Sequence, residues 1–128
     1  MKKRLLIADD DSDYLFLIKL KAESFGFEVI TADSQKEAEM ILETFKPDLA
    51  IVDLMMENED SGFILSYKIK RLYPEVPVII ATAVSAETGM SFDPGEGLSE
   101  GWIKADLVID KGIRTEQLYK EIKTLLKL

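Results

Sequence analysis

The segment that most constrains the fold of this chain is Asp48–Asp53, an apolar run between two aspartates that begins directly after Pro47. An apolar run without polar alternation is typical of a strand that is buried on both faces, as in the middle of a parallel sheet. In open sheets of this kind, ligands and chemistry lie beyond the carboxyl ends of the strands. Asp53, the last residue of the run, is therefore a candidate functional residue.

Three other short, largely apolar runs lead into polar side chains in a similar way. The runs and the residues that follow them are Arg4–Ala8 before Asp9 and Asp10, Val78–Ala81 before Thr82, and Leu107–Asp110 before Lys111. The carboxyl ends of parallel strands meet at one edge of a sheet, so these side chains are expected to converge with Asp53. An acid pair, an acid, a hydroxyl and an amine in chain order form a constellation rather than a single motif.

Segments with a helical repeat of apolar residues separate these strands, and the predicted helices span residues 12–25, 34–45, 62–72 and 115–126. Ser34 and Glu37 have the spacing of a capping box at the start of the second helix, and Tyr14 belongs to the apolar stripe of the first. Glu28–Ala32 is β-branched but flanked by charge, which predicts an edge strand. Alternating strands and helices predict right-handed crossovers and a parallel sheet with helices on both faces.

One region interrupts this alternation. The segment Ser85–Gly101 contains several glycines and Pro94 but no sustained apolar stripe, so a regular helix throughout it is not expected. It is either a tolerated surface insertion, since long loops cost little closure entropy, or a partner-binding or gating loop, since long loops in compact domains are often functional. The sequence leaves both interpretations of Ser85–Ile103 open.

A chain of 128 residues fits one domain, which we assign to residues 1–128. Its net charge of −8 argues against a nucleic-acid partner, because affinity for nucleic acids rests largely on Lys and Arg. No apolar run approaches the ~18 residues of a membrane helix, and the first run is too short for a secretory signal peptide. We therefore expect a cytoplasmic protein that binds neither nucleic acid nor membrane.

Cysteine and histidine are both absent, which excludes disulfides, thiolate catalysis, the usual zinc sites and a histidine base. The carboxylates of Asp9, Asp10 and Asp53 would repel one another where they converge, so they require a compensating cation. Mg²⁺ fits because it prefers oxygen ligands and is usually held by one or two carboxylates together with a phosphoryl group. Asp10 and Asp53 are predicted to bind it directly, Asp9 through water, and Met55 through its backbone carbonyl.

Lys111 and Thr82 complete a site suited to phosphoryl transfer onto Asp53. Lys111 is predicted to pair with Asp53 before the reaction and with a phosphoryl oxygen afterwards, and Thr82 to donate a hydrogen bond to another such oxygen. Asp53 then acts as the nucleophile in a reaction that depends on positioning and charge neutralisation. Singly, Lys111 and Thr82 are ordinary polar residues, and it is their order relative to Asp53 that favours function. Asp110 is interpreted as a surface residue, because side chains alternate along a strand.

Together these motifs resemble the receiver domain of response regulators, the phosphoacceptor module of two-component signalling. The residues that carry the resemblance are Asp9-Asp10, Ile51–Leu54, Gly62, Ile80–Ala83 and Val108–Lys111. The resemblance implies an α/β, flavodoxin-like three-layer sandwich with a five-stranded parallel sheet in the order 2-1-3-4-5. It also implies a signalling domain that catalyses only its own phosphorylation and dephosphorylation, with a histidine kinase or phosphotransfer protein as the donor.

Several positions differ from the pattern usual in this family. Glu57 replaces a proline, Gly62 lies one residue later than usual, Gly112 replaces a proline after the lysine, and Val108 replaces an aromatic residue. The first two changes imply a reshaped loop after the acceptor, and Gly112 removes a rigid turn that helps to aim the lysine. The family's fourth helix is expected to be replaced or distorted by the long loop within Ser85–Ile103.

The leading hypothesis is a stand-alone receiver that signals by phosphorylation-dependent protein binding, because nothing after the last predicted helix could form an output domain. The alternative is a receiver-like docking or scaffold module that acts independently of phosphorylation, which Gly112, Val108 and the reshaped loop suggest. The downstream partner is not identified by the sequence. Apolar residues expected on the surface are candidates for an interface: Leu15, Phe16, Phe63 and Tyr67.

Two further function classes lack a feature that they require. A phosphatase of the haloacid dehalogenase type would need a second aspartate at position 55, which is Met55. A flavodoxin-like mononucleotide binder would need a phosphate loop rich in glycine and hydroxyl groups after the first strand. The aspartates at positions 9–11 would instead repel a phosphate there.

Overall fold

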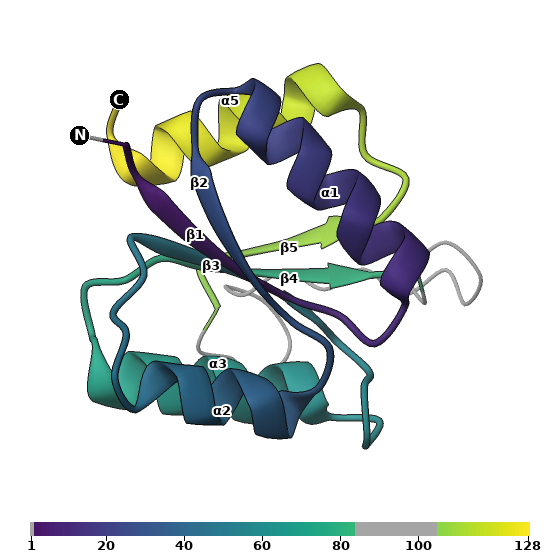
Figure 1. Cartoon of the computed structure of the whole chain (residues 1–128), viewed down its shortest axis with the longest axis vertical. Helices are drawn as coiled ribbons and strands as arrows, with labels where there is room; N and C mark the ends of the chain where they lie inside the picture. The colour runs from purple at the N-terminus through teal and green to yellow at the C-terminus, as the bar shows by residue number, and fades with distance from the viewer. Residues whose placement is uncertain (1, 84–104) are drawn as a thin grey trace.

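The computed structural model describes residues 2–83 and 105–128 of the chain (Figure 1). The strands are β1 (Arg4–Ala8), β2 (Glu28–Ala32), β3 (Leu49–Asp53), β4 (Val78–Thr82) and β5 (Leu107–Asp110). The helices are α1 (Ser12–Ser24), α2 (Gln35–Leu42), α3 (Ser61–Leu72) and α5 (Thr115–Leu126). The segment Ser85–Ile103, and with it the prediction of a replaced or distorted fourth helix, lies outside the described residues.

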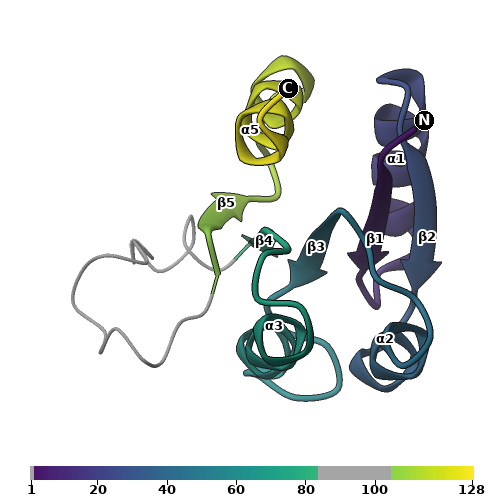
Figure 2. The same cartoon turned by 90° about the vertical axis from the view of Figure 1, so that its left-hand side faces the viewer.

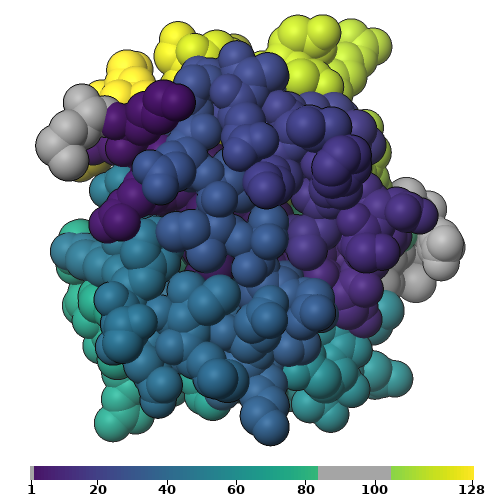
Figure 3. Space-filling model, viewed as in Figure 1, coloured from purple at the N-terminus to yellow at the C-terminus, as the bar shows by residue number. Residues whose placement is uncertain are grey.

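The five strands form one parallel sheet in the order β2-β1-β3-β4-β5, which confirms the predicted flavodoxin-like topology. Helices α1 and α5 cover one face of this sheet, and α2 and α3 cover the other (Figure 1; Figure 2). The space-filling view shows that the segments of α1, β2 and α2 make up much of one side of the molecule (Figure 3). The described residues are thus arranged as a three-layer sandwich.

Apolar packing on both faces of the sheet accounts for the buried central strands. Every residue of β3 and of β4 is buried. Alternate residues of β1 point to opposite sides: Leu6 belongs to the core under α2 and α3, whereas Leu5 and Ile7 belong to the core under α1 and α5. Burying such a side chain contributes about 1.5–3 kcal/mol. The two cores therefore hold the strands, and with them the strand ends, in a fixed register.

Helix α2 begins as predicted and ends earlier than predicted. Ser34 is its N-cap, and the Ser34 hydroxyl accepts a hydrogen bond of 3.0 Å from the Glu37 N–H. The Glu37 carboxylate in turn accepts a hydrogen bond of 2.9 Å from the Asp33 N–H. The helix ends at Leu42 rather than at Phe45 because residues 43 and 44 form a turn, although Phe45 still packs against the core.

The structure corrects part of the expected apolar surface. Leu15 is buried, and Phe63 is partly buried and packs against the core under α2 and α3, so neither is a fully exposed apolar residue. Phe16 and Tyr67 are exposed, by 63% and 46% respectively. Among the described helices, none combines the length and the apolar character needed to cross a membrane.

Candidate functional site

The carboxyl ends of four neighbouring strands bring the predicted site residues to one edge of the sheet. Asp53 is the last residue of β3 and Thr82 the last of β4, while Asp9 and Lys111 directly follow β1 and β5. Backbone hydrogen bonds continue the sheet beyond two of these ends. The Asp9 N–H donates to the Ala32 carbonyl at 3.1 Å, and the Lys111 N–H donates to the Thr82 carbonyl at 3.0 Å. The sheet therefore fixes the backbone of both residues.

Asp9, Asp10 and Asp53 lie together at this edge, as the sequence predicts. One carboxylate oxygen from each falls within 4.8 Å of the other two. Asp9 and Asp53 are 1% and 6% exposed, whereas Asp10 is exposed. The Asp9 carboxylate also accepts a hydrogen bond of 2.9 Å from the Asp11 N–H, which holds it in place. Oxygen atoms gathered at this spacing suit a hard divalent cation.

Lys111 lies between the two buried carboxylates. Its Nζ is 2.8 Å from Oδ2 of Asp9 and 3.2 Å from Oδ1 of Asp53. The sequence predicts a pair between this amine and Asp53, whereas the structure shows an additional and shorter contact to Asp9. The ammonium therefore bridges the ends of β1 and β3, and it partly offsets the repulsion between their acids.

These charged groups alter one another's protonation. Burial, and after it the negative charge of Asp9, raise the pKa of Asp53 to about 7, against the attraction of Lys111, which lowers it. Burial alone would lower the pKa of Lys111, but the hydrogen bond to Asp9 and the charges of Asp53 and Asp9 outweigh burial and raise it. When all three carboxylates are ionised, they and the one ammonium give three negative charges and one positive, a net charge of −2. A divalent cation would balance this charge.

Thr82 and Met55 lie next to the acids in the sheet and in the chain. Thr82 is buried, and β4 pairs with β3 so that its neighbour Ala81 lies opposite Asp53. Met55 comes two residues after Asp53, with its side chain exposed. The structure thus places a hydroxyl-bearing residue on the adjacent strand and a peptide carbonyl in the adjacent loop.

Tyr14 lies at the site as well as in the apolar stripe of α1 that the sequence predicts. The Nζ of Lys111 is 4.7 Å from the centre of the Tyr14 ring. Burial raises the pKa of Tyr14 first of all, and the negative charges of Asp9, Asp53 and Asp110 add to this effect, so its hydroxyl stays protonated. No local motif predicts this contact, because α1 and β5 are far apart in sequence.

Two residues at which the sequence differs from the family pattern, Gly62 and Glu57, hold the loop after Asp53 in place. The Gly62 N–H donates to the Leu54 carbonyl at 2.7 Å, and a Cβ at position 62 would lie 2.6 Å from the Asp53 carbonyl oxygen. Only glycine permits this close approach of α3 to the end of β3.

The Glu57 carboxylate accepts hydrogen bonds of 2.7 Å from the Gln35 N–H and 2.9 Å from the N–H of residue 36. The reshaped loop is therefore tied to the first turn of α2.

The turn after Lys111 is closed by Asp110 in place of the usual proline. The Asp110 carboxylate accepts a hydrogen bond of 2.6 Å from the Gly112 N–H, and the Asp110 carbonyl accepts one of 3.0 Å from the Ile113 N–H. The Asp110 side chain therefore shapes the turn that carries the lysine, a role that its predicted surface position does not indicate.

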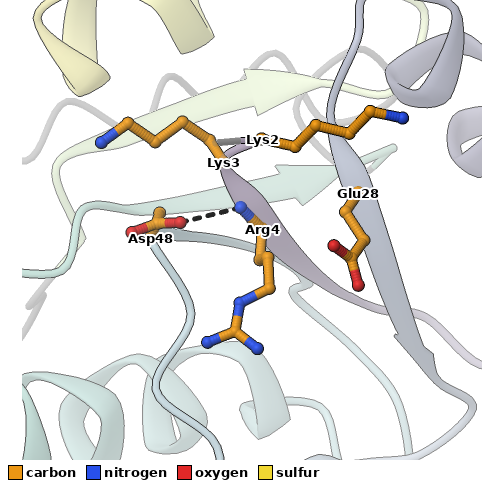
Figure 4. A pocket seen from close by; sticks show the side chains of 5 residues that line it. All are labelled: Lys2, Lys3, Arg4, Glu28 and Asp48. Atoms are coloured by element: carbon orange, nitrogen blue, oxygen red, sulfur yellow. Dashed lines mark hydrogen bonds between the residues drawn. The ribbon is translucent and has the colours of Figure 1, made fainter.

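A surface pocket lies at the opposite edge of the sheet, around the start of β1. It is lined by Lys2, Lys3, Arg4, Glu28 and Asp48 (Figure 4). The three basic side chains point in different directions, and an Asp48 carboxylate oxygen accepts a hydrogen bond of 2.8 Å from the Arg4 N–H (Figure 4). Because the basic groups diverge and acids lie beside them, this pocket does not gather charge around one ligand.

Comparison with known proteins gives a consistent match along the chain. A family model described as the response regulator receiver domain matches residues 5–123. The chain is 30% identical over 127 residues to PhoP of Bacillus subtilis, the alkaline phosphatase synthesis transcriptional regulatory protein, covering 99% of this chain and 50% of PhoP. It is also 30% identical over 127 residues to the phosphate regulon regulator PhoB of Pseudomonas aeruginosa, covering 98% of this chain and 52% of PhoB. The chain thus spans about half the length of these relatives.

Solved structures agree with this match. A CheY-like receiver domain protein from Methanospirillum hungatei superposes with a TM-score of 0.83 at 27% identity, covering 99% of this chain and 95% of that one. The response regulator TrrA of Thermotoga maritima, in complex with Mg²⁺-BeF, superposes with a TM-score of 0.78 at 25% identity, covering 98% and 99% of the two chains. The family match, the sheet order and the acids at the strand ends show that this chain belongs to the response regulator receiver domain family.

Proposed function

We propose that this receiver accepts a phosphoryl group on Asp53 from a histidine kinase or a phosphotransfer protein, in a Mg²⁺-dependent reaction. Receiver domains are signalling phosphoacceptors rather than classical enzymes. The observation that carries the proposal is the position of Asp53: its carboxylate lies 3.2 Å from the ammonium of Lys111 and within 4.8 Å of oxygens of Asp9 and Asp10. The proposed acceptor, its counter-charge and the proposed metal ligands therefore lie together at one edge of the sheet.

In the proposed reaction, an Asp53 carboxylate oxygen forms a bond to phosphorus as the P–N bond of the donor phosphohistidine breaks. The leaving imidazole nitrogen keeps the bonding electrons and takes up a proton from solvent, and Asp53 becomes an acyl phosphate. The Lys111 ammonium, now shared between Asp9 and Asp53, pairs with a phosphoryl oxygen of the product. The Thr82 hydroxyl donates to another phosphoryl oxygen. These residues act by position and charge, as is usual in phosphoryl transfer.

The donor atoms at the site fit Mg²⁺, because they are carboxylate and carbonyl oxygens and the cluster is acidic. We propose that Asp10 and Asp53 bind the ion directly, Asp9 through water, and Met55 through its backbone carbonyl. When bound, Mg²⁺ would neutralise negative charge on the acids and on the phosphoryl oxygens. The related TrrA is in complex with Mg²⁺-BeF, which supports a magnesium site in this chain.

Acetyl phosphate tests the proposal without knowledge of the kinase. The purified protein is incubated with acetyl phosphate and Mg²⁺, and its intact mass is measured against that of Asp53→Asn. The wild type is expected to gain one phosphoryl group and the variant none. An unchanged wild-type mass, or an equal gain in both proteins, would overturn the proposal.

We further propose that residues 1–128 act as one receiver domain that signals by binding a protein rather than DNA. The net charge of −8 supports this choice of partner. A fluorescence-anisotropy titration with duplex DNA is expected to show no binding with or without beryllofluoride. A pull-down with and without beryllofluoride is expected to capture a partner only in its presence. DNA binding at physiological salt would contradict this part of the proposal.

The alternative function is a docking or scaffold module that does not depend on phosphorylation. Two departures favour it: Gly112 follows the lysine, and Val108, which packs against the core under α2 and α3, stands where the family commonly has an aromatic residue. A partner that binds Asp53→Ala as tightly as the phosphorylated wild type would support this alternative.

A further inference from the structure

Lys111 reaches the buried acids from a turn that contains no proline. The Gly112 N–H donates to the Asp110 carboxylate at 2.6 Å, and this hydrogen bond fixes the backbone of the turn. The lysine side chain itself is a flexible four-carbon stem with a charged end. A fixed turn therefore does not by itself fix the ammonium, whose position depends on its contacts with Asp9 and Asp53 and on any further group that lies against it.

Tyr14 supplies such a contact. The Nζ of Lys111 lies 4.7 Å from the centre of the Tyr14 ring. A cation within about 6 Å of an aromatic ring face is attracted by the electrons of the ring, and more strongly where water is excluded. The Lys111 side chain is only 19% exposed, so this attraction is little screened. The ring adds to the attraction of Asp9 and Asp53, and it does so from a different element.

The ring of Tyr14 is itself held in place. Tyr14 lies in the first turn of α1, where the Asp11 carboxylate accepts a hydrogen bond of 3.2 Å from the Tyr14 N–H. The side chain packs against the core under α1 and α5. Its hydroxyl has no hydrogen-bond partner within residues 2–83 and 105–128. The aromatic ring, rather than the hydroxyl, is therefore the part of Tyr14 that bears on the lysine.

We propose that Tyr14 is a positioning residue. Its ring holds the Lys111 ammonium in the position that bridges Asp9 and Asp53, and from this position the ammonium moves to pair with the phosphoryl group. The inference rests on the proposed function, because it concerns how Lys111 serves phosphoryl transfer. Tyr14 acts through Lys111 and undergoes no chemical change itself.

The state of Lys111 can be measured without phosphorylation. In metal-free protein, limiting acetic anhydride acetylates free amines, and peptide mass spectrometry compares the rate at Lys111 with that at the exposed Lys120. Tyr14→Leu removes the ring, so Lys111 is expected to react roughly three- to thirtyfold faster relative to Lys120. Tyr14→Phe keeps the ring and is expected to retain the slow reaction. Phe16→Leu removes an exposed ring from the same helix and serves as the matched control.

The same proteins are then phosphorylated with acetyl phosphate and Mg²⁺. Tyr14→Leu is expected to slow phosphorylation by a factor similar to its gain in Lys111 reactivity, and Tyr14→Phe to rescue the rate. Tyr14→Met keeps most of the apolar volume without a ring, and it is made in parallel so that a folded ring-free variant is available. Amide spectra establish which variants are folded.

The outcomes separate the two proposals. A wild type that gains no phosphoryl group overturns the proposed function, whatever the labelling shows. The wild type is phosphorylated in the second outcome, and a folded ring-free variant has the same Lys111 reactivity and the same phosphorylation rate. This outcome overturns only the role of Tyr14 and leaves the proposed function standing. Faster labelling of Lys111 without slower phosphorylation also overturns that role, since the ring would then hold the lysine with no effect on transfer.

Discussion

The fold holds the carboxylates of Asp9 and Asp53 close together although their negative charges repel each other. Asp53 and Asp9 are both buried, and the pKa of Asp53 is raised to about 7 by burial and then by Asp9. An unfolded aspartate titrates near a pKa of about 3.9, so between these values the native state binds more protons than the unfolded state. Ionisation of Asp53 therefore lowers the free energy of unfolding progressively as the pH rises from about 4 to about 7.

We predict that Asp53→Asn removes this pH dependence in metal-free protein. The neutral amide carries no charge to desolvate, so the stability of the variant relative to the wild type should increase by at most about 4 kcal/mol as the pH rises from ~4 to ~8. Urea denaturation in EDTA at a series of pH values measures both proteins. A difference that stays constant over this range would contradict the raised pKa of Asp53.

Replacing either of the two glycines near the site, Gly62 or Gly112, by alanine is expected to lower the stability of the protein by different amounts. A Cβ at position 62 would lie 2.6 Å from backbone atoms of Asp53 and Leu54, whereas one at position 112 would lie 3.1 Å from a side-chain oxygen of Asp110, which can move. We predict that Gly62→Ala destabilises the protein by about 1–3 kcal/mol and Gly112→Ala by less. Urea midpoints of the two variants test this order, and equal midpoints would be inconsistent with it.

Among the helices and strands, the sequence predicts those site residues that lie at the end of a single strand. Asp53, Asp9 and Lys111 end or follow apolar runs, and parallel strands place such ends at one edge. The contact between Tyr14 and Lys111 joins α1 to the end of β5, and no short-range pattern encodes it. The hydrogen bonds from α2 to Glu57 likewise depend on how the loop after β3 packs against the start of α2. The sequence alone shows only that the usual proline is missing.

Glu57 links the loop after β3 to the N-terminus of α2. Burial alone would raise the pKa of Glu57, but the N–H groups of Lys36 and Gln35 outweigh it and lower the pKa. The ionised carboxylate therefore contributes stability that is fully present above the unfolded pKa of about 4.3 and is lost as the pH falls through the lower, folded value. The two N–H groups belong to the first turn of α2, so the carboxylate acts as a second cap beside Ser34.

We predict that Glu57→Ala destabilises the protein at neutral pH by about 1 kcal/mol and speeds hydrogen exchange at the N–H groups of Gln35 and Lys36. Glu59→Ala removes the same charge from an exposed position in the same loop and serves as the control. The effect of Glu57→Ala should fade in acid, where the wild-type carboxylate is protonated. Equal exchange rates in the two variants would argue against the link between the loop and α2.

For the whole molecule, the acid cluster concentrates negative charge in a chain that already carries a net charge of −8. A cation that binds the folded chain and not the unfolded one stabilises the fold, by about 2.7 kcal/mol when present at roughly 100 times its Kd. The sheet order and the two apolar cores keep the acids together even though they repel one another. A cation bound at the acid cluster would therefore stabilise the fold.

We predict that Mg²⁺ raises the melting temperature of the wild type in a concentration-dependent way. Asp10→Asn removes one proposed ligand, so its melting temperature should rise only at roughly tenfold or more higher Mg²⁺ concentration. Glu59→Gln makes the same change of charge in an exposed loop and should behave like the wild type. Identical Mg²⁺ responses in all three proteins would mean that the ion acts by general screening rather than at Asp10.

Asp53 is the proposed acceptor, and peptide mapping of the phosphorylated protein tests this role most directly. The wild type is treated with acetyl phosphate and Mg²⁺, digested at low pH, and searched by mass spectrometry for phosphorylated peptides. The phosphoryl group is expected only on the peptide that contains Asp53. A phosphoryl group on the peptide of Asp9 and Asp10, or on no peptide, would contradict the role of Asp53 as the acceptor.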